Sequence, residues 1–263
     1  MAQVTLIEHP LSPYAQKVKI ALLEKNIPFR ILAPMGASED EQKILHSANP
    51  RGEVPVLLDG ELSIYDSTII LEYLEDRWPE TPLLPAGAAE RAHVRTLEEV
   101  VDTHLEANSW GLAEVTIYRR ATGERANALI QYGKKQIMGW FSWLNRELRD
   151  RQYFNGETFG WGDIVVAPYV NDAARFGIAP DPQSNLAAWL ARIKERPSVT
   201  QTFAEAKAGE LNPAFMTAAL AAGFKREYRD HRLEWMIRAG AVDIVQAGLA
   251  HENIRFTETF WEE

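Results

Sequence analysis

The chain has 263 residues, a formal net charge of −9 and no Cys. Its length allows one large domain or two ordinary ones, and its apolar content of 46% supplies a sizeable core. The absence of Cys excludes disulfides, thiolate metal sites and Cys nucleophiles. The acidic balance, with no long run of Lys or Arg, argues against nucleic-acid binding. Since we also find no membrane span or export signal, we expect a cytoplasmic protein.

The first third of the chain alternates between strand and helix patterns. Asp59-Gly60, between two apolar runs, predicts a hairpin and therefore two antiparallel strands. A βαβ unit followed by ββα implies a mixed four-stranded sheet with helices on its faces. The predicted elements are strand 3–8, helix 13–26, strand 28–33, helix 39–48, strand 54–58, strand 61–64 and helix 66–77.

The rest of the chain shows helical periodicity and almost no strand signal. Pro79, Pro82 and Pro85 mark a linker, and the last helices of the domain are expected at about 184–196 and 198–207. Beyond Pro213, an alternation of basic and apolar residues predicts one or two amphipathic helices. The predicted organisation is a sheet domain at 1–83, a linker at 84–89, a helical-bundle domain at 90–212 and a helical extension at 213–263.

Ser12 stands where a strand gives way to a helix, followed by Pro13. A helix N-terminus offers unpaired N–H groups and about half a positive charge, so it is suited to hold an anion. The simpler interpretation is that Ser12 is an N-cap with Pro at the first helical position. A second helix start, at Gly160, has Asp163 three residues later but no hydroxyl at the cap, so the capping box is incomplete.

Three motifs together resemble a known family. They are Ser12-Pro13-Tyr14, the loop and strand at 49–60 with Val54-Pro55, and Asp66-Ser67 at the start of a helix. Their order and spacing over roughly the first 85 residues resemble the thioredoxin-like N-terminal domain of cytosolic glutathione transferases. The helical remainder fits that family's second domain. The expected fold class is therefore α/β plus all-α, a thioredoxin-like domain followed by a helical bundle.

The resemblance implies a role for each motif. Ser12 takes the place of the catalytic residue of the Ser-type transferases, and Val54-Pro55 that of a cis peptide whose Val54 backbone pairs with glutathione. Asp66 and Ser67 take the places that bind the γ-glutamyl group. For the glycyl carboxylate, whose partner varies in the family, the candidates are Lys43, His46 and Arg51.

A thiol like that of glutathione has a pKa of about 8.5, so making it mostly thiolate needs a shift of about two units. A hydroxyl donor and a helix terminus together supply enough stabilisation. Ser12 meets both demands. Tyr14 is a rival donor that we rank lower because it lies within the first helical turn.

The electrophile pocket is the least determined part of the prediction. Its candidates are the apolar or aromatic residues Tyr14, Trp110, Tyr118, Phe215 and Phe224, each equally explained as core packing. His residues are scattered without metal-ligand spacing, so we expect no metal.

The predicted function is a homodimeric glutathione S-transferase whose thiolate attacks a hydrophobic electrophile, in detoxification or aromatic compound metabolism. A glutathione-dependent lyase or dehalogenase that cleaves aryl compounds is an alternative. A non-catalytic transferase-like scaffold is another, suggested by the long C-terminal extension, which we expect to pack near the mouth of the electrophile site.

Overall fold

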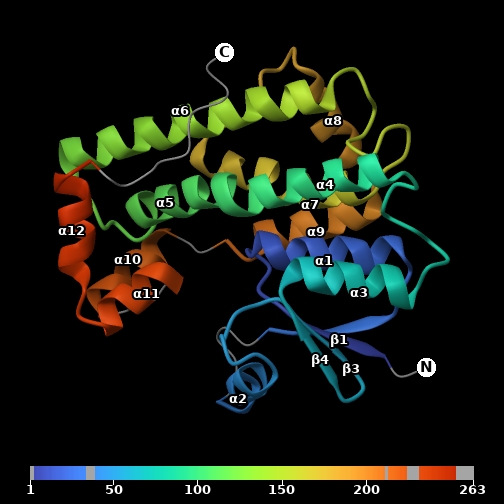
Figure 1. Ribbon diagram of the computed structural model, residues 1–263, viewed down its shortest axis with the longest axis horizontal. Coiled ribbons are helices and arrows are strands. Elements are labelled where there is room, and N and C mark those ends of the chain that lie inside the picture. Colours follow the sequence, from blue (N-terminus) through green and yellow to red (C-terminus); the bar gives the residue numbers. More distant parts are fainter. Residues whose placement is uncertain (1–2, 34–38, 211–212, 224–230, 253–263) are drawn as a thin grey trace. The chain divides into compact units, whose positions relative to one another are not determined.

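The computed structural model describes residues 3–33, 39–210, 213–223 and 231–252, without the side chains of 39–41, 213–216 and 231–232. These residues fall into two compact units, which divide after Leu211. The larger unit contains the sheet and most of the helices (Figure 1). No described helix is long and apolar enough to cross a membrane.

The N-terminal part of the larger unit is the predicted mixed sheet, with strand order β2-β1-β3-β4. β1 pairs parallel with β2 and antiparallel with β3, and the β3–β4 hairpin turns at Asp59-Gly60. Gly60 has φ +61°, which a side chain would strain. The strands are β1 (Val4–Ile7), β2 (Phe29–Leu32), β3 (Val56–Asp59) and β4 (Leu62–Tyr65).

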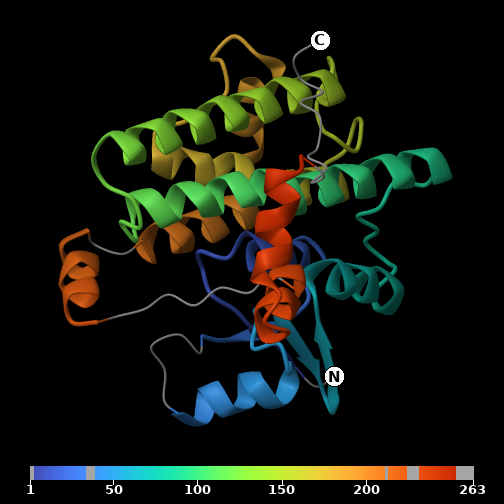
Figure 2. The ribbon, with the colours of Figure 1, turned by 60° about the vertical axis from the view of Figure 1, so that its left-hand side comes forward.

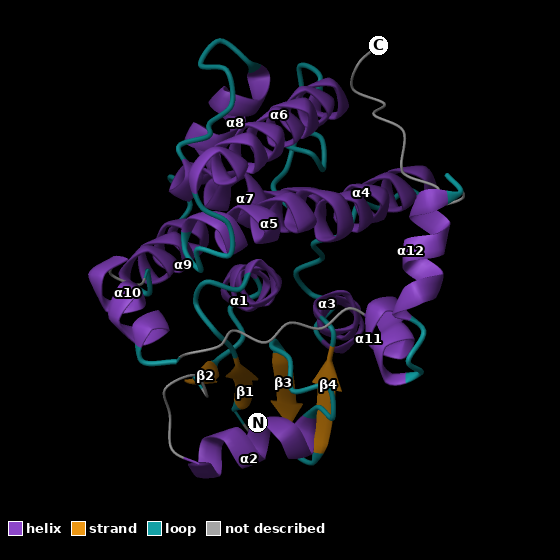
Figure 3. Ribbon diagram, turned by 90° about the vertical axis from the view of Figure 1, so that its left-hand side faces the viewer, coloured by secondary structure: helices purple, strands orange, loops and turns teal. Residues whose placement is uncertain are grey.

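Helices cover both faces of this sheet. Figure 3 shows α1 (Pro13–Glu24) and α3 (Ser67–Arg77) on one face and α2 (Glu39–Ala48) on the other. Leu45 of α2 packs with Ile7 and Val56 in a small core beneath the sheet. The order and type of these elements predicted from the sequence are confirmed, with ends displaced by at most two residues.

The remainder of the larger unit is helical, as predicted. α1 packs against α7 and α9, while α4 packs on α7 and α5 on α6, so the buried helix α7 forms the centre (Figures 1 and 2). The helices are α4 (Ala88–Val100), the π-helical η1 (Val101–Leu105), α5 (Glu106–Thr116), α6 (Gly123–Leu148), α7 (Trp161–Asp172), the 3-10 helix η2 (Ala173–Phe176), α8 (Asn185–Ile193) and α9 (Pro197–Ala208).

The smaller unit contains α10 (Pro213–Ala221), α11 (His231–Arg238) and α12 (Val242–Ala250). Its described part thus has three helices where the sequence predicted one or two, because the Ala-rich segment after Pro213 is also helical. Trp235, Ile237 and Ile244 are exposed. The aromatic segment at 255–261 lies outside the described residues, and where the extension packs stays a prediction.

Candidate functional site

The three sequence motifs converge at one edge of the sheet. The strand register places Ile7 opposite Val56 and Val56 opposite Tyr65, in one row across β1, β3 and β4. Neighbouring strands are about 4.8 Å apart. Ser12 follows the end of β1, Val54 precedes β3 by two residues, and Asp66 directly follows β4, so all three motifs extend from the same edge.

Ser12 is the N-cap of α1. Its backbone is extended (φ −77°, ψ 115°), and its Oγ accepts a hydrogen bond from the Ala15 N–H at 3.3 Å. The side chain is only partly buried, and no acceptor for the Ser12 O–H is found among the described residues. The hydroxyl therefore caps the helix and still has a proton to donate, so the two interpretations of Ser12 are compatible.

Tyr14 is engaged elsewhere. Its hydroxyl donates to the backbone carbonyl of Asp102 at 2.9 Å, and its ring meets Tyr169 edge-on with centroids 6.1 Å apart. Burial raises the pKa of Tyr14 far above its ordinary value, and the nearby carboxylates of Glu106 and Asp102 raise it further. Tyr14 thus remains protonated and joins α1 to the helical region.

A buried network of ion pairs and hydrogen bonds links α1 to α4, η1 and α7. Lys17, fully buried, donates to Glu98 at 2.9 Å and to Asp102 at 2.6 Å. Tyr169 donates to the other oxygen of Asp102 at 2.7 Å, and the Trp161 indole N–H donates to Glu98 at 2.8 Å. Burial lowers the pKa of Lys17, but the two carboxylates outweigh that effect and hold it above its ordinary value. The network fixes α1 against the helical region.

The sequence analysis did not identify this network, although α1 carries a signal for it. Lys17 shares a helical face with Tyr14, Val18 and Ala21, and a charged residue on an otherwise buried face requires a partner. Its partners are more than 80 positions away, so the sequence does not identify them. Asp102 also lies in a π-helical turn, which local periodicity does not predict.

The start of α3 leaves donors unused. Asp66, with φ 74°, caps the helix by accepting from the N–H groups of Thr68 at 3.0 Å and Ile69 at 3.4 Å. Ser67 is only 3% exposed, yet neither its N–H nor its hydroxyl finds a partner among the described residues. This helix end therefore presents two adjacent donors beside a carboxylate.

The loop before β3 is held by its own polar groups. The Asn49 side chain donates to the Glu53 carbonyl at 2.8 Å and accepts from the Arg51 N–H at 2.9 Å. The Val54-Pro55 peptide is cis, which confirms the expectation for this bond.

The three basic candidates lie in different surroundings. The Arg51 guanidinium lies 2.7 Å from the Glu53 carboxylate, so its charge is paired within the loop. Lys43 is exposed on α2, and the His46 ring contacts the Gln42 carbonyl at 2.8 Å.

The candidates for the electrophile pocket are only partly described. Trp110, in α5, and Tyr118, just after it, are half-buried aromatic residues of the larger unit. Phe215 lies in α10, but its side chain is outside the described residues, and so is the whole of Phe224. In the part of the chain that the structure describes, no group of three or more acidic, His or Cys side chains is arranged to hold a metal ion.

Comparison with known proteins agrees with this arrangement. Residues 6–82 match the model of the glutathione S-transferase N-terminal domain, and residues 103–197 match that of the C-terminal domain. The chain is 30% identical to glutathione S-transferase U25 of Arabidopsis thaliana, over 78% of this chain and 90% of the relative.

Solved structures show the same likeness. A glutathione S-transferase from Rhodospirillum rubrum is 29% identical with a TM-score of 0.66, covering 76% of this chain and 91% of the other. A rice transferase solved in complex with glutathione is 28% identical with a TM-score of 0.63, covering 76% and 92%. The chain therefore belongs to the glutathione S-transferase family, and its enzyme class is that of a transferase using glutathione.

Proposed function

We propose that Ser12 donates a hydrogen bond to the sulfur of bound glutathione, holds it as the thiolate, and so enables that sulfur to attack a hydrophobic electrophile. The observation that carries this proposal is the contrast between two neighbouring hydroxyls. The Ser12 proton has no acceptor among the described residues, whereas the Tyr14 proton is given to the Asp102 carbonyl. Of these two, only Ser12 is free to donate to a ligand.

The energetics are sufficient. Lowering the pKa of a thiol from about 8.5 by two units requires about 2.7 kcal/mol. A hydrogen bond to a charged group contributes about 1.5–3 kcal/mol, and the positive end of a helix contributes about 0.3–2 kcal/mol. Ser12 is the N-cap of α1, so a sulfur that accepts from its hydroxyl lies near both contributions.

The other motifs suit the remainder of glutathione. The N–H and hydroxyl of Ser67, which have no partner among the described residues, suit the γ-glutamyl carboxylate, and the Asp66 carboxylate suits the amino group. The Val54 backbone, positioned by the cis bond to Pro55, would pair with the glutathione peptide as an added strand does. For the glycyl carboxylate, Lys43 and Arg51 both stay candidates, and Arg51 would have to exchange its contact with the Glu53 carboxylate for one with the ligand.

The electrophile would lie against the helical region beside Tyr14. Tyr14, Trp110 and Tyr118 are half-buried aromatic residues and would line such a site, which favours an apolar and aromatic substrate. Phe215 and Phe224 stay candidates for the same pocket. A homodimeric state, a cytoplasmic location and a role in detoxification also stay predictions.

Titration of bound glutathione tests the proposal. Thiolate absorbance against pH should give a lowered pKa in the natural protein and a pKa about one to two units higher in Ser12→Ala, with glutathione affinity nearly unchanged. Tyr14→Phe is the matched control, since it removes the neighbouring hydroxyl and should leave the thiol pKa in place. If Tyr14→Phe raises the pKa and Ser12→Ala does not, the assignment to Ser12 is wrong.

A further inference from the structure

A short turn, residues 8–12, connects β1 to α1 and carries Ser12 at its end. The Ser12 N–H donates to the His9 carbonyl at 2.9 Å and closes the turn, while the Leu11 N–H donates to His9 Nδ1 at 3.2 Å. The cap bond that Ser12 Oγ accepts from the Ala15 N–H is long, at 3.3 Å, and so holds the side chain only weakly. The place of the Ser12 hydroxyl therefore depends on where the turn itself lies.

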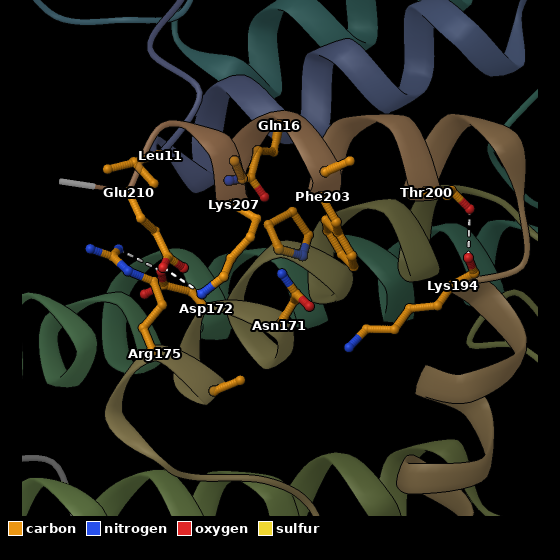
Figure 4. A pocket seen from close by; sticks show the side chains of 14 residues that line it. Leu11, Gln16, Asn171, Asp172, Arg175, Lys194, Thr200, Phe203, Lys207 and Glu210 are labelled. Carbon is orange, nitrogen blue, oxygen red and sulfur yellow. Dashed lines mark hydrogen bonds and ion pairs between the residues drawn. The ribbon is translucent and has the colours of Figure 1, made fainter. Parts of the chain in front are cut away.

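The C-terminal end of α9 packs against this turn. Gly209 follows α9, and a Cβ on it would lie 2.9 Å from Cγ of Pro10, closer than such atoms approach each other in proteins. The Gly209 backbone has φ −79°, which any residue adopts, so the approach of Pro10 explains the glycine. Leu11 of the turn and Phe203 of α9 also line the same cavity (Figure 4). Nothing larger than glycine fits at Gly209 unless the turn moves.

A buried Lys joins α9 to the start of the turn. Lys19 of α1, 1% exposed, donates to the carboxylate of Glu8, and also to that of Glu205 on α9 at 2.5 Å. The other oxygen of Glu8 is buried and has no partner in the described part of the chain, so Lys19 fixes this carboxylate. A buried ammonium that loses one of its carboxylates is strongly destabilised where it lies. Glu205 thus acts on the turn through Lys19 and Glu8.

Small movements of this turn matter for the chemistry. A hydrogen bond weakens steeply as its angle departs from linear, and a misplacement of about 1 Å can cost about a hundredfold in rate. The bond from Ser12 to a thiolate is of this kind, because the helix end and the hydroxyl stabilise the sulfur only at close range. Contacts that hold the turn therefore contribute to the ionisation of the thiol.

We propose that Glu205 and Gly209 are positioning residues for the glutathione thiolate. They hold the turn at the place from which the Ser12 hydroxyl reaches the sulfur, Glu205 through its ion pair with Lys19 and Gly209 by leaving room for Pro10. This inference rests on the proposed role of Ser12.

The first test adds a methyl group where the turn has no room, in the full-length protein. Gly209→Ala should displace Pro10 and raise the pKa of bound glutathione, read from thiolate absorbance, by about half a unit to one unit. Glutathione affinity should stay nearly unchanged. Gly133→Ala is the matched control, because its Cβ would lie 2.8 Å from Leu112 Cδ2, between α5 and α6. Both variants should lose some stability, and only Gly209→Ala should move the thiol pKa.

The second test removes a charge and keeps the shape of the side chain. Glu205→Gln should raise the thiol pKa in the same way, by a smaller amount, because Lys19 keeps Glu8. The matched control is Glu75→Gln. Glu75 pairs with buried Lys25 of the same helix at 2.7 Å, but Lys25 lies 13 positions, about 20 Å, beyond Ser12. Glu75→Gln should lower the melting temperature and leave the thiol pKa in place.

A third variant removes the contact from the other side. Pro10→Ala deletes the ring carbon that the new methyl group would meet. In the Pro10→Ala background, Gly209→Ala should therefore raise the thiol pKa less than it does in the natural protein, and the double-mutant cycle measures this coupling. A general loss of stability would not produce it.

Three results would overturn the proposal. If Ser12→Ala raises the thiol pKa but Gly209→Ala and Glu205→Gln do not, α9 has no positioning role and the assignment of Ser12 stands. If Ser12→Ala itself leaves the thiol pKa unchanged, the assignment of Ser12 is wrong and this inference is wrong with it. If Gly133→Ala and Glu75→Gln raise the thiol pKa as much as the two α9 variants, destabilisation is the cause.

Discussion

The N-termini of α7 and α3 offer the same kind of backbone N–H donors, but the chain pairs these donors differently at the two helix starts. At α7, the Trp161 N–H donates to the Leu83 carbonyl at 2.8 Å, the Gly162 N–H donates to the Asn155 side chain at 2.8 Å, and Asp163 supplies a buried carboxylate. At α3, the N–H and hydroxyl of Ser67 remain without a partner among the described residues.

The difference separates a helix start whose first N–H groups are paired within the chain from one that keeps donors open. Every helix N-terminus has orphan donors and a partial positive charge. Where the chain supplies its own anion, as Asp163 does at α7, the helix start stabilises the fold. At α3 the Asp66 carboxylate also caps two N–H groups, but the N–H and hydroxyl of Ser67 beside it find no partner among the described residues.

The largest expected effect concerns the internal anion of α7. Asp163 accepts from the Phe154 N–H at 2.8 Å, the Gly160 N–H at 3.0 Å and the Trp189 indole at 2.8 Å. Asp163→Ala leaves these buried donors unpaired, so it should lower the free energy of unfolding by about 3–5 kcal/mol. Urea unfolding measures this. Asp150→Ala, at an exposed position, should fall within about 0.5 kcal/mol of the natural protein, and an equally small effect for Asp163→Ala would show that the buried anion is dispensable.

The corresponding change at α3 should affect binding instead. Ser67→Ala should weaken glutathione binding by about 1.5–3 kcal/mol, because a charge-assisted hydrogen bond is lost, and leave the melting temperature almost unchanged. Calorimetric titration and thermal unfolding are measured together. Ser47→Ala removes an exposed hydroxyl that bonds only the Ile44 carbonyl and serves as the control. Lost stability without lost affinity would place Ser67 on the structural side of the comparison.

A third change sharpens the comparison at the α7 cap itself. Gly160→Ser would complete the capping box in sequence terms, but a Cβ at Gly160 would lie 2.4 Å from the Leu83 carbonyl oxygen and 2.0 Å from the Asn155 amide nitrogen. We therefore expect a loss of about 1–3 kcal/mol in the free energy of unfolding, from overpacking. A gain in stability measured by urea unfolding would refute this explanation of the glycine.

The smallest expected effect has the opposite sign. Gly87 caps α4 without a side-chain hydrogen bond, and only the flexible end of Glu90 stands where its Cβ would be. Gly87→Ser should therefore form a capping box with Glu90 and stabilise the protein by a few tenths of a kcal/mol in the same urea experiment. If Gly87→Ser destabilised the protein as much as Gly160→Ser, the space around the cap residue would not explain the difference between the two positions.

Gly160 also shows where prediction from sequence stopped. The sequence shows only an incomplete capping box at this position, and glycine is a tolerated cap. The structure gives the reason for the glycine: two segments that approach from Leu83 and Asn155 leave no room for a side chain. Tyr14 is a similar case, because only its contact with Asp102, 88 positions away, shows that its hydroxyl is already used.

The sequence alone determined the order of strands and helices, the hairpin at Asp59-Gly60, the cap at Ser12 and the cis bond expected at Val54. These features depend on residues within a few positions of one another, or on a family pattern that such residues carry. The tertiary structure decided the partners of Lys17, the engagement of the Tyr14 hydroxyl and the necessity of Gly160. Each of these depends on contacts between segments far apart in the chain, and local periodicity and propensity contain no information about which distant segments meet.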